Sequence, residues 1–196
     1  MRQFVILGHD APLDPAFSLD DLPGSAGRLD LLCRCVTSGL LQSHGVRDDS
    51  RVTTLHQEEF AISFDGKTVQ YLNPDDRSTA ARFRSALETA QTAVGPIPLD
   101  VSPGITVARR DLATEIEDVE GQLIMLDPEG TPMTNLAPDA SYTFVLSDHH
   151  SFSSEERDFL EAQGATRVSL GPVPLHADQA ITVAHNYLDT AGYQTY

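Results

Sequence analysis

The chain has 196 residues, a formal net charge of −16, 40% hydrophobic residues and no tryptophan. No apolar run approaches the ~18 residues of a membrane span, and the N-terminus lacks the layout of a secretory signal, so we expect a cytoplasmic protein without membrane contact. Only Lys67 among the 13 basic residues is a lysine, and an acidic surface with so little lysine is typical of a halophile's cytoplasm, where salt screens self-repulsion. The net charge therefore says little about partners, because arginines gathered in one place can still bind phosphates.

The predicted elements begin with an apolar strand at residues 4–7. A polar loop extends from there to Gly27. It is longer than a simple connection needs, which favours a functional loop. A helix follows from Arg28, with apolar residues at helical spacing. Cys33 and Cys35 lie two apart in this helix, a spacing that suits core packing better than a disulfide or a metal site.

The next segment contains further strand and turn signals. Strands are predicted at residues 51–55 and 60–64, and Asp65-Gly66 predicts a hairpin that returns as a strand at residues 69–72. A helix is expected from Asp75 to about Ala93. Glycines and prolines between Gly95 and Pro103 then mark a joint. We expect one domain with an N-terminal half, residues 1–95, and a C-terminal half, residues 104–196.

The C-terminal half alternates strands and helices. Strands are predicted at residues 105–108, 123–126, 142–146 and 167–170, and helices at 112–119, 153–163 and at the C-terminal end up to 189. This alternation predicts an α/β fold with a mostly parallel sheet and helices on both faces. Ligands then bind at the carboxyl ends of the strands, so Leu126-Asp127, the segment 146–150 and the segment 170–172 should converge on one crevice.

Two interpretations of this crevice come from the residues alone. The loop with Gly171, Pro172 and Pro174 lies before a helix and offers free backbone groups to a small polar ligand, although ordinary βα connections look the same. Asp148-His149-His150 is similar to the Asp-His-His signature of manganese phosphoesterases, with the segment 9–14 as further ligands. The spacing of Asp10 and Asp14 is loose and a second histidine cluster is missing, so we expect no metal and favour loop histidines bonded to the backbone.

A series of motifs spans the whole chain in order. The motifs are GHDAP, FSLDDLPG, GRLDLLCRC, LNPDDRSTAA, LSDHHSF and SLGPVPLHADQAI. Together they resemble the archaeal tRNA pseudouridine-54 N1-methyltransferase family of the SPOUT methyltransferases. The resemblance implies a C-terminal SPOUT-type trefoil knot, a homodimer, and S-adenosylmethionine (SAM) held without metal by the knotted loops.

The resemblance also implies the cofactor contacts. They are Leu126, Ser147, Leu170, Gly171, Pro172, Val173, Pro174, Leu175 and Ala180. Relatives often have glycine at the position of Ser147, and some have cysteine at that of Ala180. Both residues here are small, so we expect the pocket to survive as an apolar slot in which backbone groups bind the adenine edge.

The implied reaction is N1-methylation of pseudouridine in the T-loop of tRNA. The N1–H proton must leave and the nitrogen must point at the methyl group, so positioning and one carboxylate base are required. Asp30 or Asp21 is our candidate base, with Arg28 completing the site. The candidate RNA contacts are Arg28, Arg34, Arg77, Arg82 and Arg84, although each arginine can instead pair with a neighbouring carboxylate.

Substrate and assembly are the remaining expectations. A ribosomal RNA pseudouridine N1-methyltransferase shares this chemistry and is the alternative substrate assignment. The helix from Arg28 to Leu41 and the C-terminal helix both carry apolar residues on more than one face. We therefore expect one of them to supply the apolar seam of a homodimer.

Overall fold

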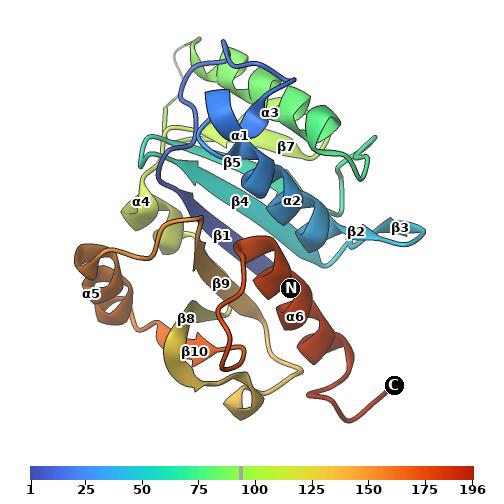
Figure 1. Ribbon diagram of the computed structural model, residues 1–196, viewed down its shortest axis with the longest axis vertical. Coiled ribbons are helices and arrows are strands. Elements are labelled where there is room, and N and C mark those ends of the chain that lie inside the picture. The colour runs from blue at the N-terminus through green and yellow to red at the C-terminus, as the bar shows by residue number, and fades with distance from the viewer. Residues whose placement is uncertain (93–94) are drawn as a thin grey trace.

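A single mixed sheet forms the centre of the protein in the computed structural model, which describes residues 1–92 and 95–196. Within these residues the sheet has eight strands in the order β10-β8-β9-β1-β4-β5-β7-β6 (Figure 1). Its parallel part contains β1 (Arg2–Gly8), β4 (Ser50–His56), β8 (Gln122–Pro132), β9 (Tyr142–Ser147) and β10 (Thr166–Ser169). Its antiparallel part adds β5 (Phe60–Asp65), β6 (Leu99–Ser102) and β7 (Ile105–Ala108). A separate ribbon pairs β2 (Leu41–Gln42) with β3 (Gly45–Val46).

Helices cover both faces of the sheet, and the alternation of side chains along β1 shows how. Phe4 and Ile6 point to the face covered by α1 (Leu22–Ser25), α2 (Leu29–Leu40), α3 (Asp76–Ala90) and α6 (Ala177–Asp189). Val5 and Leu7 point to the opposite face, where they share a core with residues of α4 (Leu112–Glu117) and α5 (Ser154–Ala162). Successive residues of a strand point to opposite faces, so a strand buried on both sides reads as a continuous apolar run. The predicted α/β architecture is confirmed.

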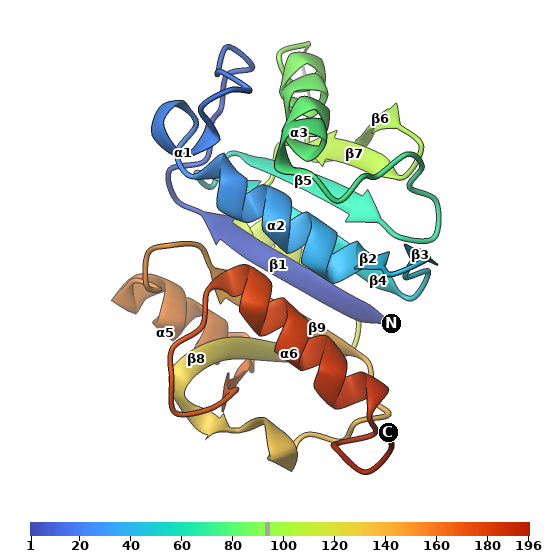
Figure 2. The ribbon, with the colours of Figure 1, turned by 45° about the vertical axis from the view of Figure 1, so that its right-hand side comes forward.

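Helix α2 lies between α3 and α6 on the first face (Figure 2). Its side chains are buried at almost every position, and Cys33 and Cys35 are buried and free, as their spacing predicted. Only Arg34, Thr37 and Ser38 are partly exposed within the helix. The apolar faces that suggested a dimer seam on this helix are thus covered inside the subunit.

The antiparallel part corrects two predictions. Residues 69–72 form no strand, because Val69 donates its amide to the carbonyl of Asp65 in a turn and places its side chain in the core. The hairpin partner of β5 is β4. The turn that joins these two strands contains Gln57 and Glu58, both with positive φ. Left-handed non-glycine residues carry no clear sequence signal, so this turn was missed.

The expected joint at residues 95–103 is also partly structured. Its end is β6, and the Pro103-Gly104 pair turns the chain into β7, with Gly104 at a φ of 74°. This proline-glycine pair, which suggested a linker in the sequence, forms a hairpin turn. Helix α3 ends at Ala90, and the predicted end at Ala93 lies outside the described residues.

Strand β8 is longer than predicted and contains an irregularity that matters for the site. Its pairing with β10 jumps from Met125 opposite Arg167 to Thr131 opposite Val168. Residues 126–130 therefore bulge out of this ladder while the strand continues beyond residue 126, where the predicted strand ended. Such bulges re-aim side chains at the edge of a sheet. No helix in the described part of the chain is long and apolar enough to span a bilayer.

Candidate cofactor pocket and active site

The carboxyl ends of β8, β9 and β10 surround one groove, as the parallel sheet predicted. Its smaller hollow lies between the bulge of β8 and the loop after β10. A larger hollow continues from it along the loop after β9. Leu126, Asp127, Pro174, Leu175 and Ala180 line both hollows, so the two form one continuous groove.

Most of the predicted cofactor contacts line this groove. Those in the smaller hollow are Leu126, Leu170, Gly171, Val173, Pro174, Leu175 and Ala180, and Ser147 lines the larger one. Pro172 lines neither. It lines a third hollow, with Met133 and Tyr193, that borders the smaller one at Leu170 and Gly171.

Several of these residues fit an adenosine-containing ligand. Val173 and Leu175 are 68% and 41% exposed, which leaves apolar surface of the groove open to solvent and available to a ligand. The hydroxyl oxygen of Ser147 is buried without a hydrogen-bond partner among the described residues. Because a buried polar atom without a partner is costly, this hydroxyl is suited to bind a ligand. The groove thus combines apolar walls with a free donor, as small-molecule sites do.

Asp127 is a residue of this groove that we did not select as a site residue. Its side chain is almost fully buried and accepts hydrogen bonds from Arg167 at 3.0 Å, from Arg157 at 3.3 Å and from the amide of Glu129. Although burial raises the pKa of this carboxyl, these bonds outweigh it and lower the pKa overall. The only sequence signal was its place after Leu126 at a strand end.

A second buried carboxylate, Asp148, lies on the β9 side of the groove. It accepts bonds from the amide and from Nδ1 of His9, at 2.9 and 3.0 Å, and from the amide of His150 at 2.9 Å. The other ring nitrogen of His9 lies 2.9 Å from Glu156 on α5. The hydrogen bond that His9 makes to Asp148 is the largest cause that raises the pKa of His9 to about 9. His9 and Glu156 are far apart in the chain, so no sequence spacing could join them.

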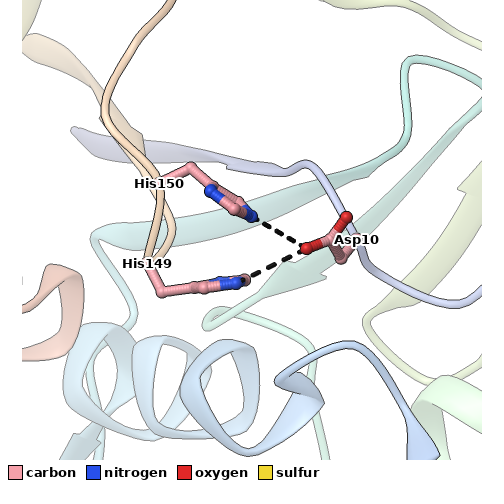
Figure 3. Close-up of side chains that lie close together, drawn as sticks. All are labelled: Asp10, His149 and His150. Carbon is pink, nitrogen blue, oxygen red and sulfur yellow. Dashed lines mark hydrogen bonds and ion pairs between the residues drawn. The ribbon is translucent and has the colours of Figure 1, made fainter.

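Three of the residues that we considered as metal ligands in the sequence lie close together, but they are not the Asp148-His149-His150 triplet. Asp10, His149 and His150 converge from the loops after β1 and β9 (Figure 3). The Nε2 atoms of His150 and His149 lie 2.8 and 3.5 Å from the same oxygen of Asp10. Asp148 is not the third member of this group, because its carboxylate faces His9.

The candidate base Asp30 lies at the start of α2 and is almost buried. Arg28, with a left-handed backbone at the N-cap, donates from Nε and a terminal nitrogen to both carboxylate oxygens, at 3.0 and 3.2 Å. Arg34 adds a bond of 2.9 Å and also lies 3.4 Å from Asp178 in the first turn of α6. These arginines lower the pKa of Asp30 despite its burial. Asp30, Arg28 and Arg34 are therefore brought together, with Arg34 reaching the helix that lines the groove.

The other predicted residues lie outside this cluster. Asp21 caps α1 by accepting the amide of Gly24. The predicted RNA contacts on α3 all have protein partners: Arg77 pairs with Asp20, Arg82 donates to the carbonyl of Tyr71, and Arg84 donates to the carbonyl of Phe17. Arg84 also stacks on the ring of Phe17, 5.1 Å from its centroid, so it holds the long loop.

Comparison with known proteins fits this geometry. A family model for SAM-dependent RNA methyltransferases matches residues 1–193. The tRNA (pseudouridine(54)-N(1))-methyltransferase of Haloarcula marismortui is 52% identical over the full length of both chains. The enzymes of the same name from Haloferax volcanii and Methanocella arvoryzae are 49% and 39% identical, the former over the full length of both chains and the latter over 94% of this chain and 97% of its own. The chain belongs to this methyltransferase family.

Family membership makes SAM the cofactor and decides against the manganese phosphoesterase. Among solved structures, Nep1 of Archaeoglobus fulgidus, bound to S-adenosylhomocysteine, covers 97% of this chain and 98% of its own, with a TM-score of 0.62 and 13% identity. That similarity confirms the SPOUT-type α/β fold predicted from the motifs. The trefoil knot itself and the division into halves stay predictions.

Proposed function

We propose that the protein transfers the methyl group of SAM to N1 of pseudouridine 54 in the T-loop of tRNA. The observation that carries this proposal is the 52% identity, over the full length of both chains, to a tRNA (pseudouridine(54)-N(1))-methyltransferase. The groove supports it, because the implied cofactor contacts other than Pro172 line one connected space. We also propose that the enzyme works in the cytoplasm, where tRNA is modified.

In this proposal the residues of the groove hold SAM by shape and by a few polar groups. Leu126, Leu170, Val173 and Leu175 enclose the adenosine, and burying the exposed parts of Val173 and Leu175 contributes to affinity at ~25 cal/mol per Å² of apolar surface. The hydroxyl of Ser147 donates its hydrogen bond to the cofactor. The bound SAM supplies a methyl group on a positively charged sulfur, and the chain's own residues must orient the target nitrogen.

The buried position of Asp30 gives it a positioning role. Its carboxylate is engaged by Arg28 and Arg34, and its lowered pKa makes it a weaker base than an ordinary carboxylate. We therefore propose that Asp30 fixes the two arginines, whose remaining donors bind a uracil carbonyl or a phosphate. Asp21 then remains the candidate base.

On α3 the arginines divide by exposure. Arg77 is 62% exposed in its side chain and pairs with an exposed Asp20, so a phosphate can replace that carboxylate at little cost. Among the described residues, Arg82 makes a single long hydrogen bond, of 3.4 Å, to the carbonyl of Tyr71. We propose Arg77 and Arg82 as contacts to the tRNA arm, with Arg84 as the residue that holds the loop beside them.

We propose a homodimer as well, on the strength of the family resemblance. The seam does not use the apolar side chains of α2, because they are buried within the subunit. Light scattering in multimolar potassium chloride should give twice the 21.3 kDa of one chain. A monomer at working salt would contradict this part of the proposal.

The decisive test of the function uses labelled SAM and short T-arm RNAs in high potassium chloride. One RNA carries pseudouridine at position 54, a second carries uridine there, and a third is a ribosomal RNA hairpin with pseudouridine. We expect methyl transfer to the first RNA alone, mapped to N1 by mass spectrometry. Transfer to the uridine RNA, or to the ribosomal hairpin alone, refutes the tRNA assignment.

Substitution of each carboxylate tests the assigned roles. Asp21→Asn should lower kcat with SAM affinity unchanged, whereas Asp30→Asn should weaken RNA binding because it releases Arg28 and Arg34. Both variants are compared in SAM binding by calorimetry, RNA binding by fluorescence anisotropy, and single-turnover rate. If both retain full turnover with intact SAM binding, neither carboxylate is the base and positioning alone remains.

A further inference from the structure

Asp10, His149 and His150 have the composition of a transition-metal site. Two imidazole nitrogens and one carboxylate oxygen are the donors that bind zinc and its neighbours in the first transition row. Their ligand atoms lie within 4.8 Å of one another and come from two loops that follow adjacent strands (Figure 3). Both histidines also line the larger hollow of the groove, but the proposed methyl transfer assigns no role to any of the three side chains.

Two of the three donor separations are close to those of a tetrahedral site, and the shorter one is a hydrogen bond that a bound ion would replace. Zinc binds nitrogen and oxygen at about 2.0–2.2 Å, so neighbouring donors of a tetrahedral ion lie roughly 3.3 Å apart. The observed separations of 2.8 Å and 3.5 Å from Asp10 to His150 and His149 bracket this value. Rotation of exposed side chains is enough to complete the geometry, because His150 and Asp10 are 50% and 58% exposed.

An independent observation comes from the far side of the His149 ring. Its Nδ1 atom lies 3.5 Å from a carboxylate oxygen of Asp148, whose side chain is 3% exposed and held by His9. A histidine that binds metal through one nitrogen commonly donates its other N–H to a carboxylate, which fixes the ring and the tautomer. Asp148 stands in that position for His149, with Nε2 left to face Asp10.

We propose that Asp10, His149 and His150 bind a divalent cation of the zinc type at the mouth of the cofactor groove, with Asp148 orienting His149. The three protein ligands leave one position for a solvent oxygen. The ion joins the loop after β1 to the loop after β9, which also carries Ser147 and lines the groove. This site is separate from methyl transfer, which proceeds without it.

Cobalt and zinc are the probes that test the site. Chelator-treated protein in potassium chloride, without phosphate, is titrated with Co²⁺ while the visible absorption is followed, and Zn²⁺ is then added. We expect one Co²⁺ per chain with the strong absorption of a tetrahedral complex, displaced by Zn²⁺. A wild-type protein without a saturable band overturns the proposal.

Matched variants locate the site and guard against misfolding. His150→Ala and Asp10→Asn should weaken Co²⁺ binding at least 100-fold, and Asp148→Asn should weaken it 10- to 100-fold, as outer carboxylates of metal sites do. His44→Ala, in the exposed β2–β3 turn, should bind like the wild type. SAM affinity in metal-free buffer must be unchanged for Asp10→Asn, whose side chain does not line the groove, which shows that the groove is intact. Co²⁺ binding that survives in both His150→Ala and Asp10→Asn, or that is lost in His44→Ala, places the ion elsewhere.

Discussion

The two buried carboxylates of the groove, Asp127 and Asp148, are stabilised in different ways. Both side chains are 3% exposed, and both have lowered pKa values. Asp127 is paired with two arginines, whose charge is permanent over the accessible pH range. Asp148 is paired with His9, a group that titrates. Helix α5 reaches both sides, since Glu156 contacts His9 and Arg157 contacts Asp127.

This difference gives the Asp148 side of the groove an alkaline limit of stability that the Asp127 side lacks. A carboxylate with a lowered pKa contributes stability at neutral pH and loses it as the pH falls through the acid range, which applies to both sides. The raised pKa of His9 works the other way. Its contribution is complete below the unfolded value near 6.5 and disappears as the pH rises through about 9. Only the Asp148 side of the groove therefore loses part of its contribution to the free energy of unfolding at alkaline pH.

The largest effect is expected for Asp127→Ala. Among the described residues, the substitution leaves Arg157 without a counter-charge and leaves Arg167 with the more exposed Glu129 and Glu161. Because both arginines are about one-third exposed, we expect a loss of about 2 kcal/mol in the free energy of unfolding, below the full penalty of a buried pair. Urea denaturation at pH 7 and pH 10 measures it. The loss should be equal at both values.

The control for this variant is Glu129→Ala. Glu129 lies 3.3 Å from the same Arg167, but its side chain is 85% exposed. We expect a change below about 0.5 kcal/mol, as for other surface pairs. If Glu129→Ala costs as much as Asp127→Ala, burial is not the cause of the difference.

A smaller effect, dependent on pH, is expected for His9→Gln. Glutamine keeps a hydrogen-bonding group but not the positive charge between Asp148 and Glu156, so we expect a loss of about 1 kcal/mol in the free energy of unfolding at pH 6. The difference from the wild type should vanish by pH 10, where His9 of the wild type is neutral. A matched His44→Gln variant should show no difference at either pH. A His9→Gln deficit that persists at pH 10 would show that packing, not charge, stabilises this side of the groove.

The smallest effect is expected for Ser147→Ala. The substitution removes the buried hydroxyl that has no partner among the described residues, so the free protein should gain a little stability while SAM affinity falls about threefold. Calorimetry with SAM and thermal unfolding without it measure the two changes. A variant that binds SAM as tightly as the wild type would show that the hydroxyl does not face the cofactor.

The sequence predicts the parallel part of the fold far better than its antiparallel part. Apolar runs such as that of β1 are long, buried on both faces and flanked by helices, and their order alone predicts a groove at the carboxyl ends. The turn at Gln57 and Glu58 uses left-handed residues other than glycine, which carry no clear sequence signal. The Pro103-Gly104 pair is compatible with a linker as well as with the hairpin turn that it forms. The false strand at residues 69–72 arose because a buried valine in a turn has the same residue type as one in a strand.

The residues of the site also differ in how far the sequence predicts them. Residues that follow one another in a motif, such as those of the loop at 170–175 other than Pro172, line one groove because the chain itself keeps them together. Partners that meet across the fold, such as His9 with Glu156 or Asp30 with two arginines, were either missed or given another role. Residue type shows that an arginine can bind phosphate, but only the structure shows which carboxylate already holds it.

The position of β1 also affects how the protein is made. This first strand lies between β4 and β9, so one of its edges can pair once residue 56 has left the ribosome, but the other waits for residues 142–147. At roughly 5–20 residues per second, the stretch between residues 56 and 147 takes on the order of 5 to 20 s to synthesise. During that time the nascent chain carries an open edge of buried residues, including Phe4 and Ile6, that a chaperone or a neighbouring polypeptide can bind.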